Sequence, residues 1–348
     1  MRRSVPGQGN NYAGGEEIIF MEKARNRRYF IKGEGEASEQ DSDKINAGMD
    51  AYMSGKFQQE AVEKTDKQKE DFKWLIGEVG YVAGLYGSIP YDFKPEHIHT
   101  INQDEYEKID IVREKKLHAM YGREGVIVGE KTLEKIGELN GLILLTHELF
   151  HAFSSNKFSL NRLSEDNVSI NYQHRSGVSY RYPMAANNQK KPLRQEIFLG
   201  LNEAITQEAT RVFYTRIIKK SERFKDLVAE FEKDKDPEEL FFPEAASYGI
   251  YGWLVRLLLD LCKKISEKRP DKFESFDGVR DEFFRIYFSG DIKGLKSLLD
   301  IVDPRCFGKL MDLKDGSDQN NIKMIKQIRK DLSLPEDPGL LHLNNDEN

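Results

Sequence analysis

The stretch that decides the fold runs from Leu144 to Phe153 and reads LLTHELFHAF. It contains the pattern His-Glu-x-x-His, and residues four apart on an α-helix lie on one face, about one turn apart. His147 and His151 can therefore direct both imidazoles at one metal ion, while Glu148 can reach a water molecule bound to that ion. Zinc suits two neutral imidazoles, and burying such groups in an apolar helix is costly unless they are paired or bound.

The pattern is unusual for a chain with seven histidines in 348 residues. At that frequency an accidental match would arise in roughly a few chains per hundred. An alternative is a helix whose histidines form hydrogen bonds in the core and whose Glu148 faces solvent. The apolar context of the pattern favours a metal site over this alternative.

The residues before the pattern predict the elements that surround it. Apolar residues in phase predict one helix from about Thr132 to Phe153 and another from Asp66 to about Gly87. The segments His97–Ile101 and Gly125–Gly129 read as short strands. We interpret Val126–Val128 as an edge strand that pairs with an extended substrate.

The residues after the pattern predict a β-hairpin and a series of helices. Alternating apolar residues at Val168–Tyr172 and Val178–Tyr182 predict the two strands, with the sequence HRSG as the turn and His174 at its tip. A long helix is expected from about Leu201 to Phe224. Further helices are expected around 243–267, 278–288, 291–301 and 321–332.

A catalytic zinc site needs a third protein ligand. The metzincin pattern does not supply it, because Ser154 and Lys157 stand where that pattern requires Gly and His. His174 is one candidate for the third ligand. Glu203 is a better one, because Asn202 is a good N-cap and Glu203 would then open the next helix.

At this point the sequence resembles the gluzincin metallopeptidases, in which an HExxH helix is followed by a helix that opens with Asn-Glu. The resemblance covers roughly residues 95–255 and rests on five residues, His147, Glu148, His151, Asn202 and Glu203. It implies a fold that is α+β and mostly helical, with a zincin-like metallopeptidase domain, a small β-sheet and a C-terminal helical region. It also implies a Zn²⁺ cofactor with Glu203 as the third ligand.

The sequence departs from the family after the Glu ligand. Ala204 stands where the family often has Gly, and Gln207 stands where it often has a carboxylate that supports a zinc histidine. The Gln207 amide oxygen can still accept a hydrogen bond from an imidazole N–H, but without charge. Glu208 is one residue further on, and we expect it to point away from the site into solvent.

The resemblance also implies a mechanism of peptide-bond hydrolysis. The ion would lower the pKa of a bound water, and Glu148 would take a proton from that water as general base and pass it to the leaving amine. A Tyr or His from another element would stabilise the oxyanion. Tyr251 is our choice, with Tyr248, Tyr180 and Tyr182 as the other candidates.

The composition indicates which kinds of partner and which cellular compartment to expect. A net charge of −6 argues against a general nucleic-acid binder. Cys262 and Cys306 form no CxxC pair, so we expect two buried, reduced thiols. No apolar run is long enough to span a bilayer and none follows Arg2 and Arg3, so we expect a cytoplasmic protein without a signal peptide or a membrane partner.

We divide the chain into four regions. These are a polar, disordered or loosely attached segment at 1–65, a zincin-like catalytic region at 66–233, a helical region at 234–334 and a flexible tail at 335–348.

Two alternatives to a general peptidase remain. The first is an inactive zinc-binding scaffold for protein interactions, which would need a fourth protein ligand to close its site. The second is a peptidase that cleaves a single regulator such as a phage-type repressor. The sequence shows no helix-turn-helix signature or basic stretch to support that role.

Overall fold

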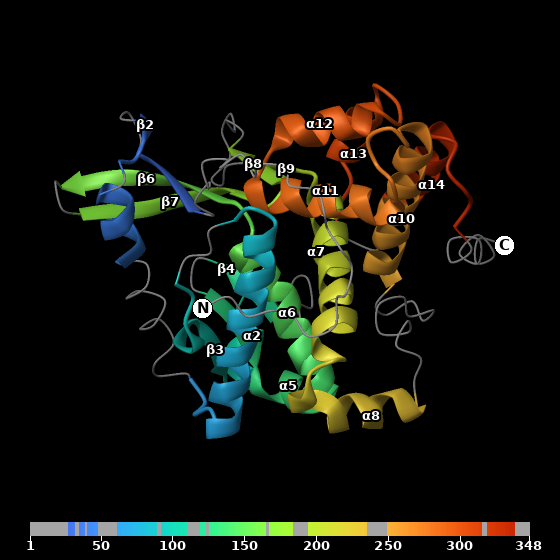
Figure 1. Ribbon diagram of the computed structural model, residues 1–348. Helices are drawn as coiled ribbons and strands as arrows, with labels where there is room; N and C mark the ends of the chain where they lie inside the picture. The colour runs from blue at the N-terminus through green and yellow to red at the C-terminus, as the bar shows by residue number, and fades with distance from the viewer. Residues whose placement is uncertain are drawn as a thin grey trace, which may run out of the picture.

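The computed structural model describes residues 27–31, 35–38, 40–47, 61–88, 92–109, 119–122, 125–164, 167–183, 194–234, 249–314 and 319–337. Within these ranges the protein is α+β and mostly helical (Figure 1). Residues 40–47 are helical, and the further helices are α2 (Asp66–Leu85), α3 (Gln103–Glu107), α5 (Glu130–Ile136), α6 (Glu138–Phe153), α7 (Leu199–Phe213), α8 (Lys225–Asp234), α10 (Gly249–Lys268), α11 (Phe276–Ser289), α12 (Ile292–Asp300), α13 (Cys306–Met311) and α14 (Gln319–Asp331). The shorter helical turns are η1 (Pro95–His97), η2 (Tyr214–Ile218) and η3 (Glu222–Phe224).

A three-stranded sheet lies beside α6. Its order is β3 (Ile98–Ile101), β5 (Gly125–Gly129) and β4 (Ala119–Gly122), with β5 parallel to β3 and antiparallel to β4. Both strands expected before the helix are therefore present. The interpretation of Val126–Val128 as an edge strand is wrong, because β5 forms hydrogen bonds to a neighbour on each side. Strand β4 is the terminal strand beyond β5, and it packs against α6.

A second sheet has six strands in the order β2 (Gly35–Glu36), β1 (Arg27–Ile31), β6 (Asn156–Ser164), β7 (Asn167–Ser176), β8 (Ser179–Pro183) and β9 (Arg194–Ile197). Strands β6 and β7 extend toward the left of Figure 1, away from α6 and α7. The expected hairpin is β7–β8, but its turn is Gly177-Val178. His174 consequently lies within β7 and not at a tip.

The helix expected over 132–153 is two helices. Gly137 adopts a φ of +76°, which ends α5 and starts α6 in a new direction. A left-handed residue cannot continue a right-handed helix, and glycine adopts this conformation without steric cost. All of α6 from Leu145 to Phe153 is buried, with α2 packed on one side of it and α7 on another.

Helix α7 begins at Leu199 and not at Leu201 as expected, and it ends at Phe213 well before Phe224. A π-helical turn, η2, follows it directly. The start of α7 is fixed by a segment from the far end of the chain. The Phe198 N–H donates to Met311 O and the Gly200 N–H donates to Leu313 O, both at 2.8 Å.

One hydrophobic cluster joins the regions on either side of residue 234. It includes Leu149 of α6, Ile205 of α7, Leu258 of α10 and Phe284 of α11. The four later helices expected from the sequence are present as α10, α11, α12 and α14, with α13 in addition. The expectation for the two cysteines is confirmed, because both thiols are free and buried.

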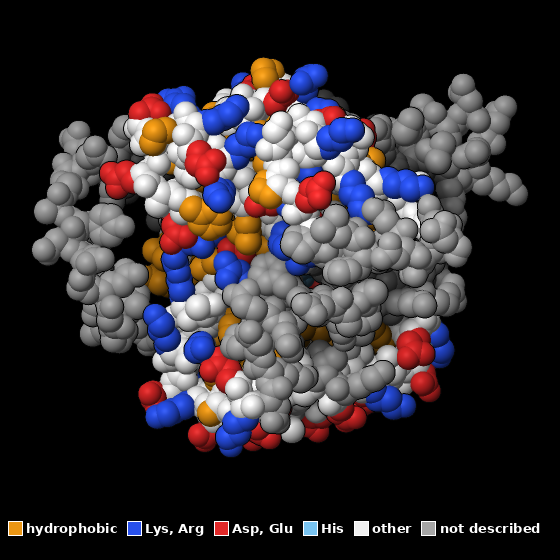
Figure 2. Space-filling view, turned by 90° about the vertical axis from the view of Figure 1, so that its right-hand side faces the viewer, with side chains coloured by type: hydrophobic (Ala, Val, Ile, Leu, Met, Phe, Trp, Pro, Cys, Tyr) orange, Lys and Arg blue, Asp and Glu red, His pale blue; other side chains and the backbone are white. Residues whose placement is uncertain are grey.

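The ends, surface and helices of the described chain add four observations. Residues 27–31, within the expected loose segment, form β1 and pair with β6. Asp337, within the expected tail, is buried and its carboxylate is 2.9 Å from Arg256 Nε. On the face drawn in Figure 2, Lys and Arg side chains lie among Asp and Glu side chains. Among the described helices, none combines the length and apolar character needed to cross a membrane.

Candidate metal centre

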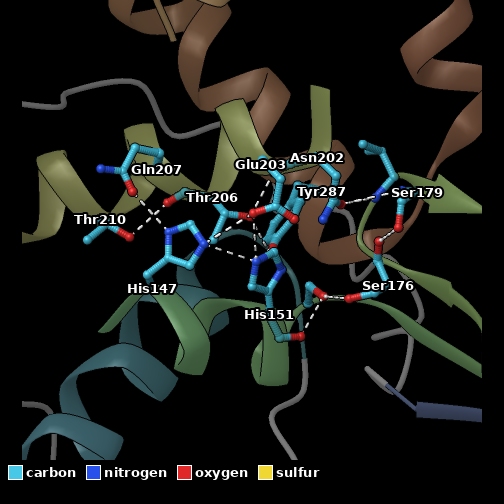
Figure 3. A network of polar contacts seen from close by, with 12 residues as sticks. His147, His151, Ser176, Ser179, Asn202, Glu203, Thr206, Gln207, Thr210 and Tyr287 are labelled. Atoms are coloured by element: carbon cyan, nitrogen blue, oxygen red, sulfur yellow. Dashed lines mark hydrogen bonds and ion pairs between the residues drawn. The ribbon is translucent and has the colours of Figure 1, made fainter. Parts of the chain in front are cut away.

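Two helices place three polar side chains around one point. His147 and His151 come from α6, and Glu203 comes from α7 (Figure 3). The His147 Nε2, His151 Nε2 and Glu203 Oε2 atoms form a triangle in which every side is 3.2 Å. Each of these residues is at most 9% exposed, so the triangle lies within the protein but is not sealed from solvent.

The triangle has the dimensions of one face of a zinc coordination shell. Ligand atoms about 2.0–2.1 Å from a tetrahedral ion are about 3.3 Å from one another. The donors are also suitable, because two imidazole nitrogens and a carboxylate oxygen are a usual set for catalytic zinc. Among the described residues, these three are the group whose ligand atoms converge closely enough to hold a metal ion.

Gln207 makes the contact expected from the sequence. Its Oε1 atom is 3.0 Å from His147 Nδ1, one turn of α7 beyond Glu203. An amide oxygen only accepts hydrogen bonds, so Nδ1 carries a proton in this contact, and Nε2 is the nitrogen that would coordinate an ion at the triangle. The neutral amide thus orients His147 without adding charge.

Tyr287 makes the corresponding contact to the second histidine. Its hydroxyl oxygen is 3.4 Å from His151 Nδ1, and the residue is fully buried in α11. Sequence reasoning missed this residue. It lies 136 positions from His151 and is one of fifteen tyrosines, so no local pattern marks it.

Asn202 has a different role from the expected one. It does not cap a helix, because α7 has already begun at Leu199. Its side-chain oxygen accepts hydrogen bonds from the backbone N–H groups of Val178 at 3.0 Å and Ser179 at 3.4 Å. Asn202 therefore fastens the β7–β8 turn to the helix turn that carries Glu203.

The same turn requires glycine at position 177. Gly177 has a φ of +58°, and a Cβ there would lie 2.4 Å from both Asn202 Oδ1 and the Tyr287 ring. Such distances are far inside van der Waals contact, so the backbone approaches the site as closely as it can. The turn, Asn202 and Tyr287 consequently form one packed unit behind the triangle.

The two carboxyl groups of the site have opposite electrostatic environments. Burial raises the pKa of Glu148 to about 7, against opposing contributions from His147 and the Tyr121 backbone N–H, while the Glu203 charge raises it further. Burial also raises the pKa of Glu203. However, the charge of His151 and hydrogen bonds from both imidazoles outweigh burial and hold that pKa well below its usual range. Glu203 is therefore the ionised member, and Glu148 can gain or lose a proton near neutral pH.

Glu208 points away from the triangle, as expected, but it does not face solvent. Its side chain is fully buried, with its two oxygens 2.7 and 2.8 Å from Arg211 and one of them 3.7 Å from Arg280 Nη1. The expectation of an exposed charge is wrong because α7 is covered on this side by α10 and α11. Glu208 instead joins α7 to Arg280 of α11.

The tyrosines proposed to stabilise an oxyanion remain a prediction. Tyr248 lies outside the described residues, and only the backbones of Tyr251 and Tyr182 are described, in α10 and β8. Tyr180 is half-buried in β8.

Comparison of the chain with protein families, with curated proteins and with solved structures gave no match.

Proposed function

We propose that this protein is a zinc-dependent metallopeptidase of the gluzincin type with a zincin-like fold. One observation carries the proposal. Three ligand atoms from His147, His151 and Glu203 converge in a triangle of 3.2 Å sides, and Glu148 follows the first ligand directly on the same helix.

The roles of the residues follow from their chemistry. His147, His151 and Glu203 would hold the ion, which when bound acts as a Lewis acid and lowers the pKa of a water molecule to about 7. Glu148 would accept a proton from that water and deliver it to the leaving amine. In the metal-free protein, burial raises the pKa of Glu148, which favours a group that can hold the proton it takes before passing it on.

The strand next to the site supports a peptide substrate. Among the described residues β4 is the terminal strand of its sheet, and its Tyr121 N–H forms a hydrogen bond to the Glu148 carboxylate. An extended peptide can add to a free sheet edge through backbone hydrogen bonds. We propose β4, in place of Val126–Val128, as the strand along which a substrate lies.

The inactive-scaffold alternative has less support. A structural zinc site is normally closed by four protein ligands, and three ligands converge among the described residues. A scaffold also has no use for a buried carboxyl such as Glu148, whose ionised form is disfavoured by burial. Such a group fits a base that works in catalysis better than one that only stabilises the fold.

The test begins with metal content, measured by mass spectrometry on the purified wild type and Glu203→Ala. We expect about one zinc per chain in the wild type and much less in the variant, because a carboxylate ligand is lost. Glu138→Ala, which removes an exposed carboxylate from the first turn of α6, is the control and should keep its zinc. A wild type without zinc after growth in zinc-supplemented medium would refute the metal centre.

Activity is tested on the wild type and Glu148→Gln with a peptide library. We expect cleavage by the wild type, and for the variant a full zinc content with hydrolysis slower by orders of magnitude. Equal cleavage by both proteins would refute the role of Glu148. Zinc binding without any cleavage would favour the scaffold.

A further inference from the structure

Behind the triangle, a chain of buried hydroxyl groups leads from His151 into α7 (Figure 3). The Tyr287 hydroxyl is 3.4 Å from His151 Nδ1 and 2.9 Å from Thr206 Oγ1. Thr206 Oγ1 is in turn 2.8 Å from the carbonyl oxygen of Asn202. Tyr287 and Thr206 are both completely buried, so water does not compete for these contacts.

The number of hydroxyl protons determines which group donates and which accepts in each of these hydrogen bonds. A hydroxyl group carries one proton and a carbonyl oxygen carries none. The Thr206 proton must lie on the 2.8 Å contact to Asn202 O, because two oxygens that close repel each other without one. Thr206 then accepts from Tyr287, and Tyr287 can only accept from His151, whose Nδ1 must carry a proton.

The reverse order satisfies fewer contacts. If Thr206 donated to Tyr287 and Tyr287 donated to His151, the contact between Thr206 and Asn202 would have no proton. Ser154 does not change this result. Its hydroxyl also interacts with Tyr287 but donates its own proton to His151 O at 2.8 Å, so it too can only accept from the phenol. Either acceptor directs the Tyr287 proton away from His151.

We propose that Tyr287 and Thr206 are positioning residues that hold His151 with a proton on Nδ1 and so present its Nε2 to the proposed metal ion. The inference rests on the metal centre proposed above. It assigns a role in that centre to α11, a helix of the C-terminal region, and gives each histidine its own uncharged partner. Gln207 orients His147, and Tyr287 orients His151.

The hydroxyl of Tyr287 can be separated from its ring. The ring packs against Phe288 at 5.0 Å between centroids and against Gly177, so loss of the whole side chain would disturb the fold. Tyr287→Phe keeps the ring and removes only the hydrogen bonds. Thr206→Val likewise keeps the shape of Thr206 and removes its hydroxyl.

The protein contains a matched control residue for each of these two variants. Tyr214 is as buried as Tyr287, and its hydroxyl is 3.4 Å from the Glu232 carboxylate. Thr210 is buried in the same helix as Thr206 and forms the same 2.8 Å bond to the carbonyl four residues before it. Tyr214→Phe and Thr210→Val therefore remove equivalent hydroxyl groups that do not reach His151.

The first readout is the zinc dissociation constant, measured by competition with a chromogenic chelator. Loss of a partner that orients a ligand usually costs about 10–100-fold in metal affinity. We expect a weakening in that range for Tyr287→Phe, a smaller one for Thr206→Val, and recovery in Thr206→Ser. The double variant should bind zinc no more weakly than Tyr287→Phe alone, because both changes break one chain. The controls should match the wild type.

The second readout is the imidazole N–H signal in nuclear magnetic resonance of zinc-loaded protein labelled with ¹⁵N-histidine. In the wild type we expect a His151 Nδ1–H signal that exchanges slowly with water. It should broaden or shift in Tyr287→Phe but not in Tyr214→Phe, and a structural role alone would not produce that difference. The His147 signal should be unchanged in both.

The outcomes separate this inference from the proposed function. Tight zinc binding by the wild type together with an unchanged affinity and N–H signal in Tyr287→Phe would overturn the inference and leave the metal centre intact. A wild type that binds no zinc would overturn both. If Tyr287→Phe fails to fold, an affinity of the double variant Thr206→Val, Ser154→Ala equal to that of Thr210→Val would overturn the inference, because that double variant removes both acceptors of the Tyr287 proton.

Discussion

Replacement of Glu148 by Gln should make the metal-free protein more stable while abolishing the proposed peptidase activity. Burial raises the pKa of this carboxyl from 4.5 to about 7 in the folded protein. At about 1.36 kcal/mol per pH unit, this difference disfavours the ionised folded state by about 3 kcal/mol. A neutral glutamine of nearly the same shape does not carry this penalty.

The sign of the pH dependence follows from proton binding. Between pH 4.5 and about 7 the folded protein binds more protons at Glu148 than the unfolded chain does. The free energy of unfolding of the wild type therefore falls, through this group, as the pH rises across that interval. The advantage of Glu148→Gln should be small near pH 4.5 and should reach about 3 kcal/mol above pH 7.

Urea unfolding followed by circular dichroism measures this difference at several pH values from 5 to 8, with a chelator present to exclude metal. Glu134→Gln, which removes an exposed carboxylate from α5, controls for the lost negative charge. The control should follow the wild type at every pH. A constant difference between Glu148→Gln and the wild type from pH 5 to pH 8 would refute the reasoning, since it would mean that Glu148 does not titrate in this interval.

Three further predictions test the surroundings of the site. Gly177→Ala should destabilise the protein by about 1–3 kcal/mol in urea unfolding and weaken zinc binding, because a Cβ there would lie 2.4 Å from Asn202 Oδ1 at a φ of +58°. A loss of stability with unchanged zinc binding would show that the β7–β8 turn does not support the metal centre. Glu208→Ala should cost about 1–3 kcal/mol, since it removes a fully buried carboxylate that is 2.7 Å from Arg211 and 3.7 Å from Arg280, while Arg280 keeps Asp277 at 3.0 Å. Asp271→Ala, which breaks an exposed pair, should leave the unfolding midpoint unchanged. Zinc at about 100 times its dissociation constant should stabilise the wild type by about 2.7 kcal/mol in thermal unfolding. Glu203→Ala should show no such gain.

Local sequence patterns predicted the elements and contacts that depend on neighbouring residues. The period of apolar residues located α2 and the later helices, and β-branched residues located β5. The four-residue spacing also placed His147 beside His151. The contact between Gln207 and His147 could be foreseen because Gln207 lies one turn beyond Glu203 on the same helix. Helix geometry alone determines these relations.

The predictions made from the sequence were wrong where segments distant in the sequence meet. α7 begins early because its first N–H groups donate to Met311 and Leu313, and Asn202 is consequently within the helix and free to bind the β7–β8 turn. β5 became a central strand because β4 pairs on one side of it and β3 on the other. Gly137 breaks a helix that the apolar period alone would have continued.

The sequence by itself determined the chemistry of the candidate site, because an HExxH pattern on one helix fixes the relative positions of two ligands and a base. Only the tertiary structure decided the surroundings of those groups. It brought Tyr287 to His151, which lies 136 residues away in the sequence. It also buried Glu208 of α7 beside Arg280 of α11. It also buried Glu148 enough to raise its pKa to about 7. Burial and long-range contacts depend on how whole elements pack, and no short stretch of sequence encodes that packing.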